Sequence, residues 1–210
     1  YAFTDGQIRS TDGGTWPVEA YRQVTNEYLV QHSSAKRARN LRESYMVGAL
    51  ARFNLNQEHL HPAAKAAASA LNLRPRCINP YANTLAQVVE IAHCVEAAIH
   101  IIDTLLARGV VWEEPVAAAR LSGEGVGACE VPRGTLYHNY VIENGVITAA
   151  NCIIPAGQTL ANIEADMRSL VTQSTDRRPE EITVALEVLV RAHAPCISGS
   201  TQRRTVRVVG

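Results

Sequence analysis

Cys196, which follows Pro195, is the residue of this chain best suited to bind a transition metal. A thiolate at the exit of a helix is a soft ligand for nickel, iron or zinc. Closed thiolate or imidazole sites, however, take three or four protein ligands, and a single cysteine does not supply them. Considered without its neighbours, Cys196 is therefore better explained as a buried structural thiol.

Arg133 occupies a corner of the backbone between the rigid Pro132 and the permissive Gly134. A guanidinium fixed on such a corner could polarise a bound ligand or organise a hydrogen-bond network. The alternative is an ordinary buried ion pair with Glu130 or another carboxylate. The residue types alone leave both interpretations open, and the ion pair is the simpler one.

Glu90, His93 and Glu96 follow one another in steps of three along the longest predicted helix. Such steps place side chains on neighbouring helix faces, and a Glu-x-x-His pair is half of what a di-iron bundle uses. The sequence offers no second Glu-x-x-His helix, so we expect no metal there. The glycines of 123–127 lack the Lys-Ser/Thr of a phosphate-binding loop, and there is no Gly-x-Ser-x-Gly elbow.

Composition predicts one globular domain, residues 1–210. The apolar fraction is 47%, enough for a core, and 20 basic residues balance 20 acidic ones. The balance gives no reason to expect nucleic acid or an anionic membrane as partner. No apolar run reaches the roughly 20 residues of a transmembrane helix, because polar residues interrupt 88–106.

The cysteines and the first residue bear on location. Five dispersed cysteines without a Cys-x-x-Cys pair predict reduced thiols in a cytoplasmic protein. The chain begins with Tyr1 instead of a methionine, which suggests a piece of a longer product, so a signal peptide is not excluded.

Periodicity predicts a mainly helical chain with small antiparallel hairpins, an α+β class. Residues 1–16 read as short strands and turns, and the basic stretch within 33–55 as a solvated face or loop. Asn144-Gly145 between two apolar runs predicts a hairpin with a type I′ turn. Apolar residues at helical spacing predict helices over 18–32, 57–71, 84–107, 159–172 and 179–192, the third with an apolar stripe.

Several segments, taken in order, resemble the large subunit of the nickel–iron hydrogenases. YMVGALARFN at 45–54 is similar to the family's Y-x-V-G-P-L-A-R-x-N, and GVGACEVPRGTLYH at 125–138 to G-x-x-E-A-P-R-G-x-L-x-H. VRAHAPC at 190–196 resembles V-R-x-x-D-P-C. Weaker matches are Asn79-Pro80, Glu90 and His93, the Asn144-Gly145 turn, and Asn162 to Asp166. The likeness covers nearly the whole chain, corresponds to the C-terminal half of such a subunit, and is closest to the cytoplasmic multi-subunit branch coupled to NAD or a deazaflavin.

The resemblance implies a hydrogenase-like helical bundle and a Ni–Fe centre. In the family, four cysteines hold the nickel, and two of them bridge to an iron that carries CO and cyanide. Dihydrogen is split there, and electrons leave through an iron–sulfur small subunit and further redox subunits. By position, Cys196 matches the first C-terminal metal ligand and Arg133 a catalytic base or electrostatic partner. Pro132, Glu130 and His138 match residues that surround the metal ligands, and such residues tune a metal strongly.

Three substitutions and one absent motif affect that implication. Gly199 stands where the second, bridging cysteine is expected, and Ala194 where an aspartate is usual. Gln202 replaces the histidine after which family members are trimmed, and the N-terminal Cys-x-x-Cys is absent from this chain. The simplest inference is that a normal Ni–Fe centre does not assemble on these residues alone.

Three functions remain open at this point. The chain could be half of an active hydrogenase large subunit whose other ligands lie elsewhere. It could be a metal-free scaffold or interaction subunit of a redox complex, or a binder of a small molecule or single metal in the vestigial cleft. The first is favoured by the intact Pro132-Arg133-Gly134 corner, and the second by substitutions clustered in one tail. We expect Cys196 and Arg133 to approach each other across a cleft.

Overall fold

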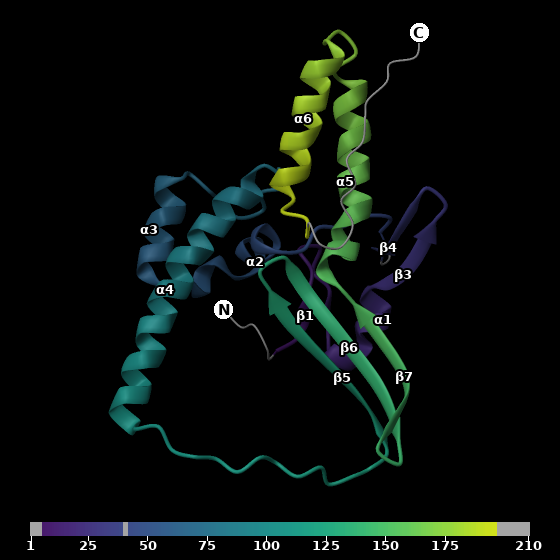
Figure 1. The fold of residues 1–210 in the computed structure, drawn as a ribbon. Helices are drawn as coiled ribbons and strands as arrows, with labels where there is room; N and C mark the ends of the chain where they lie inside the picture. Colours follow the sequence, from purple (N-terminus) through teal and green to yellow (C-terminus); the bar gives the residue numbers. More distant parts are fainter. Residues whose placement is uncertain (1–5, 40–41, 197–210) are drawn as a thin grey trace.

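The computed structural model describes residues 6–39 and 42–196, and Figure 1 shows their arrangement. Helices and small antiparallel sheets make up the fold, so the predicted α+β class is confirmed. The helices are η1 (Val18–Ala20), α1 (Tyr21–Val24), α2 (Ala49–Asn56), η2 (Gln57–His59), α3 (Pro62–Ala70), α4 (Ala82–Arg108), α5 (Pro155–Thr172) and α6 (Pro179–Ala192). The strands are β1 (Ile8–Arg9), β2 (Thr15–Trp16), β3 (Asn26–Val30), β4 (Ser33–Arg39), β5 (Gly123–Val131), β6 (Gly134–Glu143) and β7 (Val146–Ile153).

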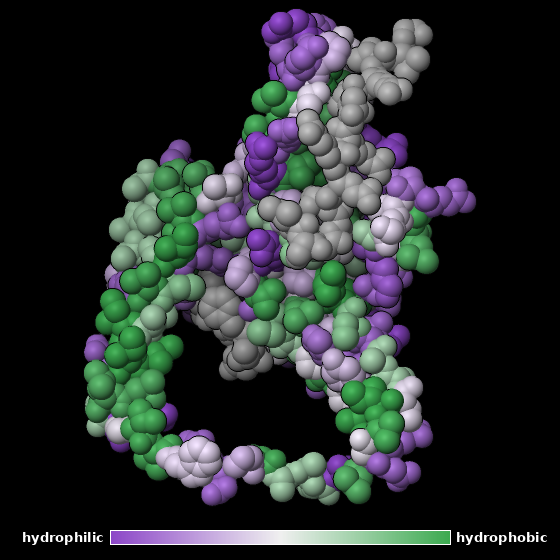
Figure 2. All heavy atoms as spheres, viewed as in Figure 1, coloured by the Kyte–Doolittle hydropathy of each residue, from purple (hydrophilic) through white to green (hydrophobic). Residues whose placement is uncertain are grey.

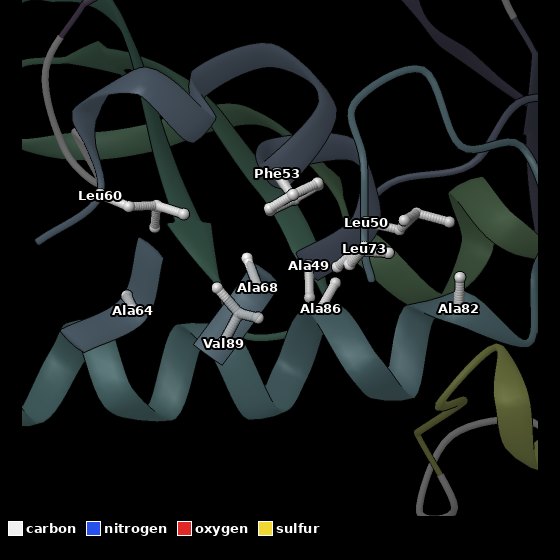
Figure 3. Close-up of a cluster of buried hydrophobic side chains, with 10 residues drawn as sticks. All are labelled: Ala49, Leu50, Phe53, Leu60, Ala64, Ala68, Leu73, Ala82, Ala86 and Val89. Carbon is white, nitrogen blue, oxygen red and sulfur yellow. The ribbon is translucent and has the colours of Figure 1, made fainter. Parts of the chain in front are cut away.

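The main apolar core lies where α2 and α3 pack along the first part of α4 (Figure 3). Phe53 and Leu50 of α2 and Val89 of α4 belong to one buried cluster, and its remaining members are mostly alanines: Ala49, Ala64, Ala68, Ala82 and Ala86. Small side chains let the helix backbones approach closely, which explains why so short a helix as α3 is buried on one side. This packing fixes α2, which carries Arg52.

The largest sheet has the order β5-β6-β7. Asn144 and Gly145 connect β6 to β7 with φ of 51° and 80°, as the predicted type I′ turn requires. A second apolar cluster of Tyr21, Ala38, Tyr137 and Ile153 joins the sheet to α1 and β4. The rings of Tyr21 and Tyr137 stack with centroids 5.4 Å apart. The sheet therefore holds the Pro132-Arg133-Gly134 corner, which links β5 to β6, on a rigid base.

Helices α5 and α6 form a hairpin that stands above the sheet in Figure 1. Each begins with a proline at its first turn, where the missing N–H costs nothing. The end of α6 is attached to the start of α4, because Asn83 Nδ2 donates to the carbonyl of Ala192 at 3.0 Å. The hairpin thus delivers the segment that ends in Cys196 to the region of the α2–α4 core.

The expected helix over 18–32 is wrong beyond its first turns. Helical structure ends at Val24, and Asn26–Val30 forms β3, which pairs with β4. Tyr28 and Val30 are half-buried while Leu29 between them is 73% exposed, so the apolar residues here follow the period of a strand. The basic stretch was expected to be a loop or solvated face, and its first part is strand β4.

Most of the other expected elements are present with shifted limits. The helix expected over 57–71 is divided into η2 and α3 at Pro62, and helix α2, which was not predicted, precedes it. The long helix runs from Ala82 to Arg108, and the hairpin and both C-terminal helices are present. Strand β5 was not predicted, because the alternating glycines of 123–127 gave no apolar signal. All five cysteines are free, as expected.

Glu164 on α5 predicts a measurable pH dependence of stability. Hydrogen bonds from Arg168 first, and then from Arg37 and His32, lower the pKa of the Glu164 carboxyl to about 2. The folded state therefore binds fewer protons than the unfolded state between the ordinary glutamate pKa of roughly 4.3 and pH 2, so stability falls as the pH falls through this window. Urea titrations across it should show a smaller loss for Glu164→Gln than for the unchanged chain. An equal loss in both proteins would contradict the assignment.

Candidate functional site

The Pro132-Arg133-Gly134 corner is packed directly against the start of α2. Gly134 has a φ of 134°, and a Cβ atom there would lie 2.3 Å from Cγ2 of Val47. Gly48 has a φ of 102°, and its Cβ would lie 3.2 Å from the carbonyl oxygen of Arg133. Two segments far apart in the sequence therefore approach at backbone distance, which only glycine permits at both positions.

Arg52 of α2 holds this corner with all five of its N–H donors. Its Nε and Nη2 donate to Glu90 on α4 at 2.6 and 2.7 Å, and Nη1 donates to Glu130 at 2.6 Å. Nη1 and Nη2 also donate to the carbonyls of Val131 and Pro132, both at 2.9 Å. Burial opposes the charge of Arg52, but the two carboxylates outweigh it and raise the pKa of the guanidinium. Arg52 thus fixes the backbone on the N-terminal side of Arg133.

The same network continues through Glu130 into the sheet and α5. Thr135 Oγ1 donates to Glu130, and Gln158 Nε2 donates to the carbonyl of Thr135 at 2.6 Å. Tyr45 in turn donates to Gln158 at 3.2 Å. These side chains line a cavity of about 390 Å³ that also reaches Tyr137, where burial raises the pKa of the phenol to about 12. The phenol of Tyr137 therefore keeps its proton near neutral pH.

Arg133 itself points towards the segment that follows α6. Its Nε donates to the carbonyl of Ala194 at 3.0 Å, and its side chain is exposed. Ala194 lies two residues before Cys196, a span of at most about 7 Å of extended chain. The structure thus brings the guanidinium to the tail that carries the thiol. The alternative ion pair with Glu130 is not formed, because Glu130 pairs with Arg52.

His193, next to Ala194, is buried against α5. Its Nε2 lies 3.0 Å from Oδ2 of Asp166, which also accepts a hydrogen bond from Asn162. Its Nδ1 is buried without a hydrogen-bond partner in the described part of the chain. Burial lowers the pKa of His193, and Asp166 offsets only part of this effect. A neutral imidazole that donates to Asp166 therefore anchors the tail below α6.

The remaining sequence candidates fall in two other places. His138 on β6 lies 2.7 Å from the hydroxyl of Tyr140 and 3.4 Å from Sγ of Cys152, on the sheet face opposite Tyr137. It therefore does not face the cavity that Tyr137 lines. Pro132 serves the site through its carbonyl, which accepts from Arg52.

The side chains of Glu90, His93 and Glu96 have structural partners. Glu90 binds Arg52, His93 Nδ1 accepts from the backbone N–H of His61 at 3.2 Å, and Glu96 accepts from that of Ala63 at 2.8 Å. The three side chains thus tie α4 to α2 and α3.

The donor atoms of the described residues do not fit a complete metal centre. Within 6–39 and 42–196, no three side chains of His, Cys, Asp or Glu come close enough together to share one ion. Cys196 would supply one thiolate, and closed sites need three or four ligands. Gly199 and Gln202, the two departures further along the tail, lie outside the described residues.

Arg52 is a residue of the site for which sequence analysis predicted no role of its own. It lies within YMVGALARFN, whose resemblance to the family concerns the segment as a whole. A signal was present, because Arg52 lies on the apolar side of a short helix between Leu50 and Phe53, both buried. A charged residue in that position requires a partner, and Glu90 within the apolar α4 was the available candidate.

The fold matches that of hydrogenase large subunits. The structure of an NAD+-reducing [NiFe]-hydrogenase in the H2-reduced state superposes with a TM-score of 0.78 at 24% identity. The match covers 96% of this chain and 48% of the solved one. The helical bundle with a small antiparallel sheet is therefore the architecture of that class of protein, as predicted.

The sequence gives the family. Residues 7–201 match the model of the nickel-dependent hydrogenases, and the chain belongs to this family. The alpha subunit of sulfhydrogenase 1 from Pyrococcus furiosus is 34% identical over 200 residues, which are 95% of this chain and 46% of that subunit. The beta subunit of the NAD-reducing hydrogenase HoxS from Cupriavidus necator is 32% identical over 168 residues, or 75% of this chain and 34% of the subunit. This chain thus spans about half the length of these relatives or less.

Proposed function

We propose that this chain forms the C-terminal half of a nickel–iron hydrogenase-type large subunit, and that its own tail does not complete the metal centre. One contact carries the proposal: Arg133 Nε donates to the carbonyl of Ala194, in the tail that bears Cys196. Arg52 supports this contact because it donates to the carbonyl of Pro132, the residue before Arg133. Residues around a metal ligand position that ligand. We therefore expect this contact between Arg133 and the tail in a subunit that still assembles like other members of the family.

The described residues of this chain place a positive charge near the tail and hold the backbone around it in position, but they supply few metal ligands. Arg133 places a positive charge at the tail, and Arg52 with Glu130 keeps the corner rigid. In relatives of this type a Ni–Fe centre supplies the redox chemistry of dihydrogen. Here Cys196 is the residue offered as metal ligand, while Pro132, Glu130 and His138 are proposed to belong to its surroundings, with His138 the least direct because it contacts Tyr140 and Cys152.

A second function, an active dihydrogen-oxidising half-subunit whose remaining ligands come from another segment, is favoured by the same intact corner. The metal-free scaffold is favoured by the donor set, because the described residues bring together no three ligands. Relatives are named as subunits, such as the beta subunit of the NAD-reducing hydrogenase HoxS, and this supports assembly of this chain with further subunits. We propose an iron–sulfur small subunit and other redox subunits as partners, in the cytoplasm.

Metal analysis of the purified complex separates the two functions. Because a bridging thiolate is replaced by Gly199, we expect nickel well below one ion per complex and no dihydrogen-dependent reduction of a redox dye. The control is the sulfhydrogenase 1 complex of Pyrococcus furiosus, handled in the same way. Stoichiometric nickel together with dye reduction in the complex of this chain would contradict the scaffold function.

A repair experiment tests the tail. Gly199→Cys restores the expected thiol, yet we expect it to leave turnover absent, because Gln202 still replaces the histidine at which family members are trimmed. The double variant Gly199→Cys/Gln202→His is the matched comparison, assayed for nickel content and for processing by intact mass. Turnover in the single variant would show that trimming does not depend on residue 202.

A further inference from the structure

Three side chains that can exchange protons lie together on the face of the main sheet opposite Tyr137. His138 and Tyr140 are two residues apart on β6, so they share a face, and His138 is the register partner of Cys152 on β7. Nδ1 of His138 lies 2.7 Å from the hydroxyl of Tyr140 and 3.4 Å from Sγ of Cys152. The hydroxyl lies 3.8 Å from the same sulfur. A thiol, an imidazole and a phenol therefore meet at one place.

This arrangement can convert the thiol into its nucleophilic form. An imidazole beside a cysteine acts as the base that takes the thiol proton, and the thiolate is the form that attacks. Here Nδ1 of His138 is within reach of the Cys152 thiol. The phenol of Tyr140 stabilises the resulting sulfur anion by donating its O–H to it. The hydrogen bond with Cys152, followed by burial, raises the pKa of Tyr140, so the phenol keeps the proton that it donates.

A positive charge lies near the same sulfur. Lys36 on β4 donates from Nζ to Glu27 at 2.9 Å, and this hydrogen bond is the main cause that raises the pKa of Lys36. The charge of Cys152 is a further, smaller cause, so the ammonium group is within electrostatic reach of the thiol. The Lys36 side chain is 60% exposed and Cys152 is half-buried. Lys36 therefore attracts negatively charged molecules towards this thiol.

Two other cysteines provide a comparison. Cys94 is exposed on α4, a helix whose visible surface is largely hydrophobic in Figure 2. Partial burial of its sulfur, and then the charge of Glu90, raise the pKa of the Cys94 thiol, so it stays protonated near neutral pH. The thiol of Cys129 donates to the carbonyl of Glu130 at 3.7 Å. Accessibility alone would favour reaction at Cys94, whereas the neighbouring groups favour Cys152.

We propose that Cys152 is a modification site that forms mixed disulfides with small, negatively charged disulfides. The thiol proton passes to Nδ1 of His138, and the sulfur of Cys152 attacks one sulfur of the small disulfide. A new S–S bond forms while the old one breaks, and the departing thiolate takes the proton from the imidazole. Cys152 is thereby oxidised, and half of the small disulfide is reduced to a thiol.

A metal ion fits this cluster less well. Cys152 and His138 are two ligands, and closed sites take three or four. Among residues 6–39 and 42–196, no third His, Cys, Asp or Glu side chain joins them. The ammonium group of Lys36 also repels a cation. The site lies apart from Arg133 and Cys196, so it goes beyond the proposed metal chemistry.

The rates at which individual cysteines of the full chain react test the proposal. The probes are iodoacetamide and oxidised glutathione at neutral pH, with each cysteine followed by peptide mass spectrometry. Cys152 should react about tenfold faster than Cys94 or more. His138→Gln should slow Cys152 to about the rate of Cys94 and leave Cys94 unchanged. His59→Gln is the matched control, because His59 is 60% exposed and contacts Glu58; it should change neither rate.

A second pair of probes tests the preference for negative charge. Oxidised glutathione is anionic and cystamine is cationic. Lys36→Met should therefore slow the reaction of Cys152 with oxidised glutathione about threefold at low ionic strength, without slowing the reaction with cystamine. The same effect on both probes would contradict the role of Lys36 and the stated class of disulfide.

Three outcomes overturn the modification site itself. In the first, Cys152 reacts no faster than Cys94 in the unchanged chain. In the second, Cys152 keeps its rate in His138→Gln. In the third, His138→Gln changes both cysteines equally, which would show that His138 acts on the fold instead of on the thiol. The readout is the reaction of one thiol, so a failed nickel or dihydrogen assay leaves this result unaffected.

Discussion

Arg52→Met should destabilise this protein more than any other single surface or core substitution named here. The change leaves Glu90 and Glu130 facing each other with side chains only 12% and 25% exposed, and it frees the carbonyls of Val131 and Pro132. Breaking a buried ion pair from one side costs about 3–5 kcal/mol, because the remaining carboxylates lose the guanidinium that offsets their burial. Urea unfolding followed by circular dichroism measures the loss.

The control for Arg52 is an ion pair of the same chemistry on the surface. Arg191 pairs with Glu187 within α6, with side chains 74% and 58% exposed, so Arg191→Met should cost less than about 1 kcal/mol. The double variant Arg52→Met/Glu90→Gln should recover part of the lost free energy of unfolding, because it removes one of the two buried carboxylates. An Arg52→Met protein as stable as Arg191→Met would show that the network does not hold the corner.

Gly134→Ala should be the second most damaging change. A φ of 134° is strained for alanine, and the new methyl group would lie 2.3 Å from Val47 Cγ2 and 2.7 Å from its Cβ. Left-handed backbone costs roughly 1–2 kcal/mol and overpacking about 1–3 kcal/mol more. We therefore expect a loss of about 2–5 kcal/mol in the free energy of unfolding, together with displacement of Arg133 from Ala194.

Two comparisons isolate the cause. Gly127 on the neighbouring strand β5 has open space where a Cβ would be, so Gly127→Ala should be close to neutral. Val47→Ala combined with Gly134→Ala removes the nearest methyl group and should recover part of the overpacking loss, because the Cβ of residue 47 still lies 2.7 Å from the new methyl group. If Gly127→Ala and Gly134→Ala were equally harmful, β-sheet propensity would explain both and the close backbone approach would not matter.

The sequence predicted those elements whose signal is local. The Asn144-Gly145 turn, the long α4 and the two C-terminal helices follow from turn chemistry and from helical spacing within one segment. The region around Tyr28 could not be assigned in this way, because four or five residues fit either period and pairing with β4 decides between them. The alternating glycines of β5 carry no apolar pattern at all, and that strand exists because β6 pairs with it along its whole length.

The candidate site could also be predicted only in part, because some of its contacts join segments that lie far apart in the sequence. Pro132-Arg133-Gly134 and Cys196 were identified from residue types and from the family's wording. The contact of Arg133 with a main-chain carbonyl of the tail, and the role of Arg52, depend on segments brought together by the fold. The direction of the α4 stripe is a similar case. Helical spacing predicted an apolar stripe on α4 but not which of its apolar residues are buried. Ala86 and Val89 are buried while Ile99 and Ile102 are exposed, because burial depends on where α2 and α3 pack against α4.

The β6–β7 turn has a consequence for the chemical ageing of the chain. Asparagine followed by glycine is prone to deamidation, in which the next backbone nitrogen attacks the side-chain amide and expels ammonia. In this protein the nitrogen that would attack, that of Gly145, is engaged by the carbonyl of Leu121 at 2.7 Å. The connection from α4 thereby shields the hairpin from succinimide formation, so loosening that connection would shorten the lifetime of the turn.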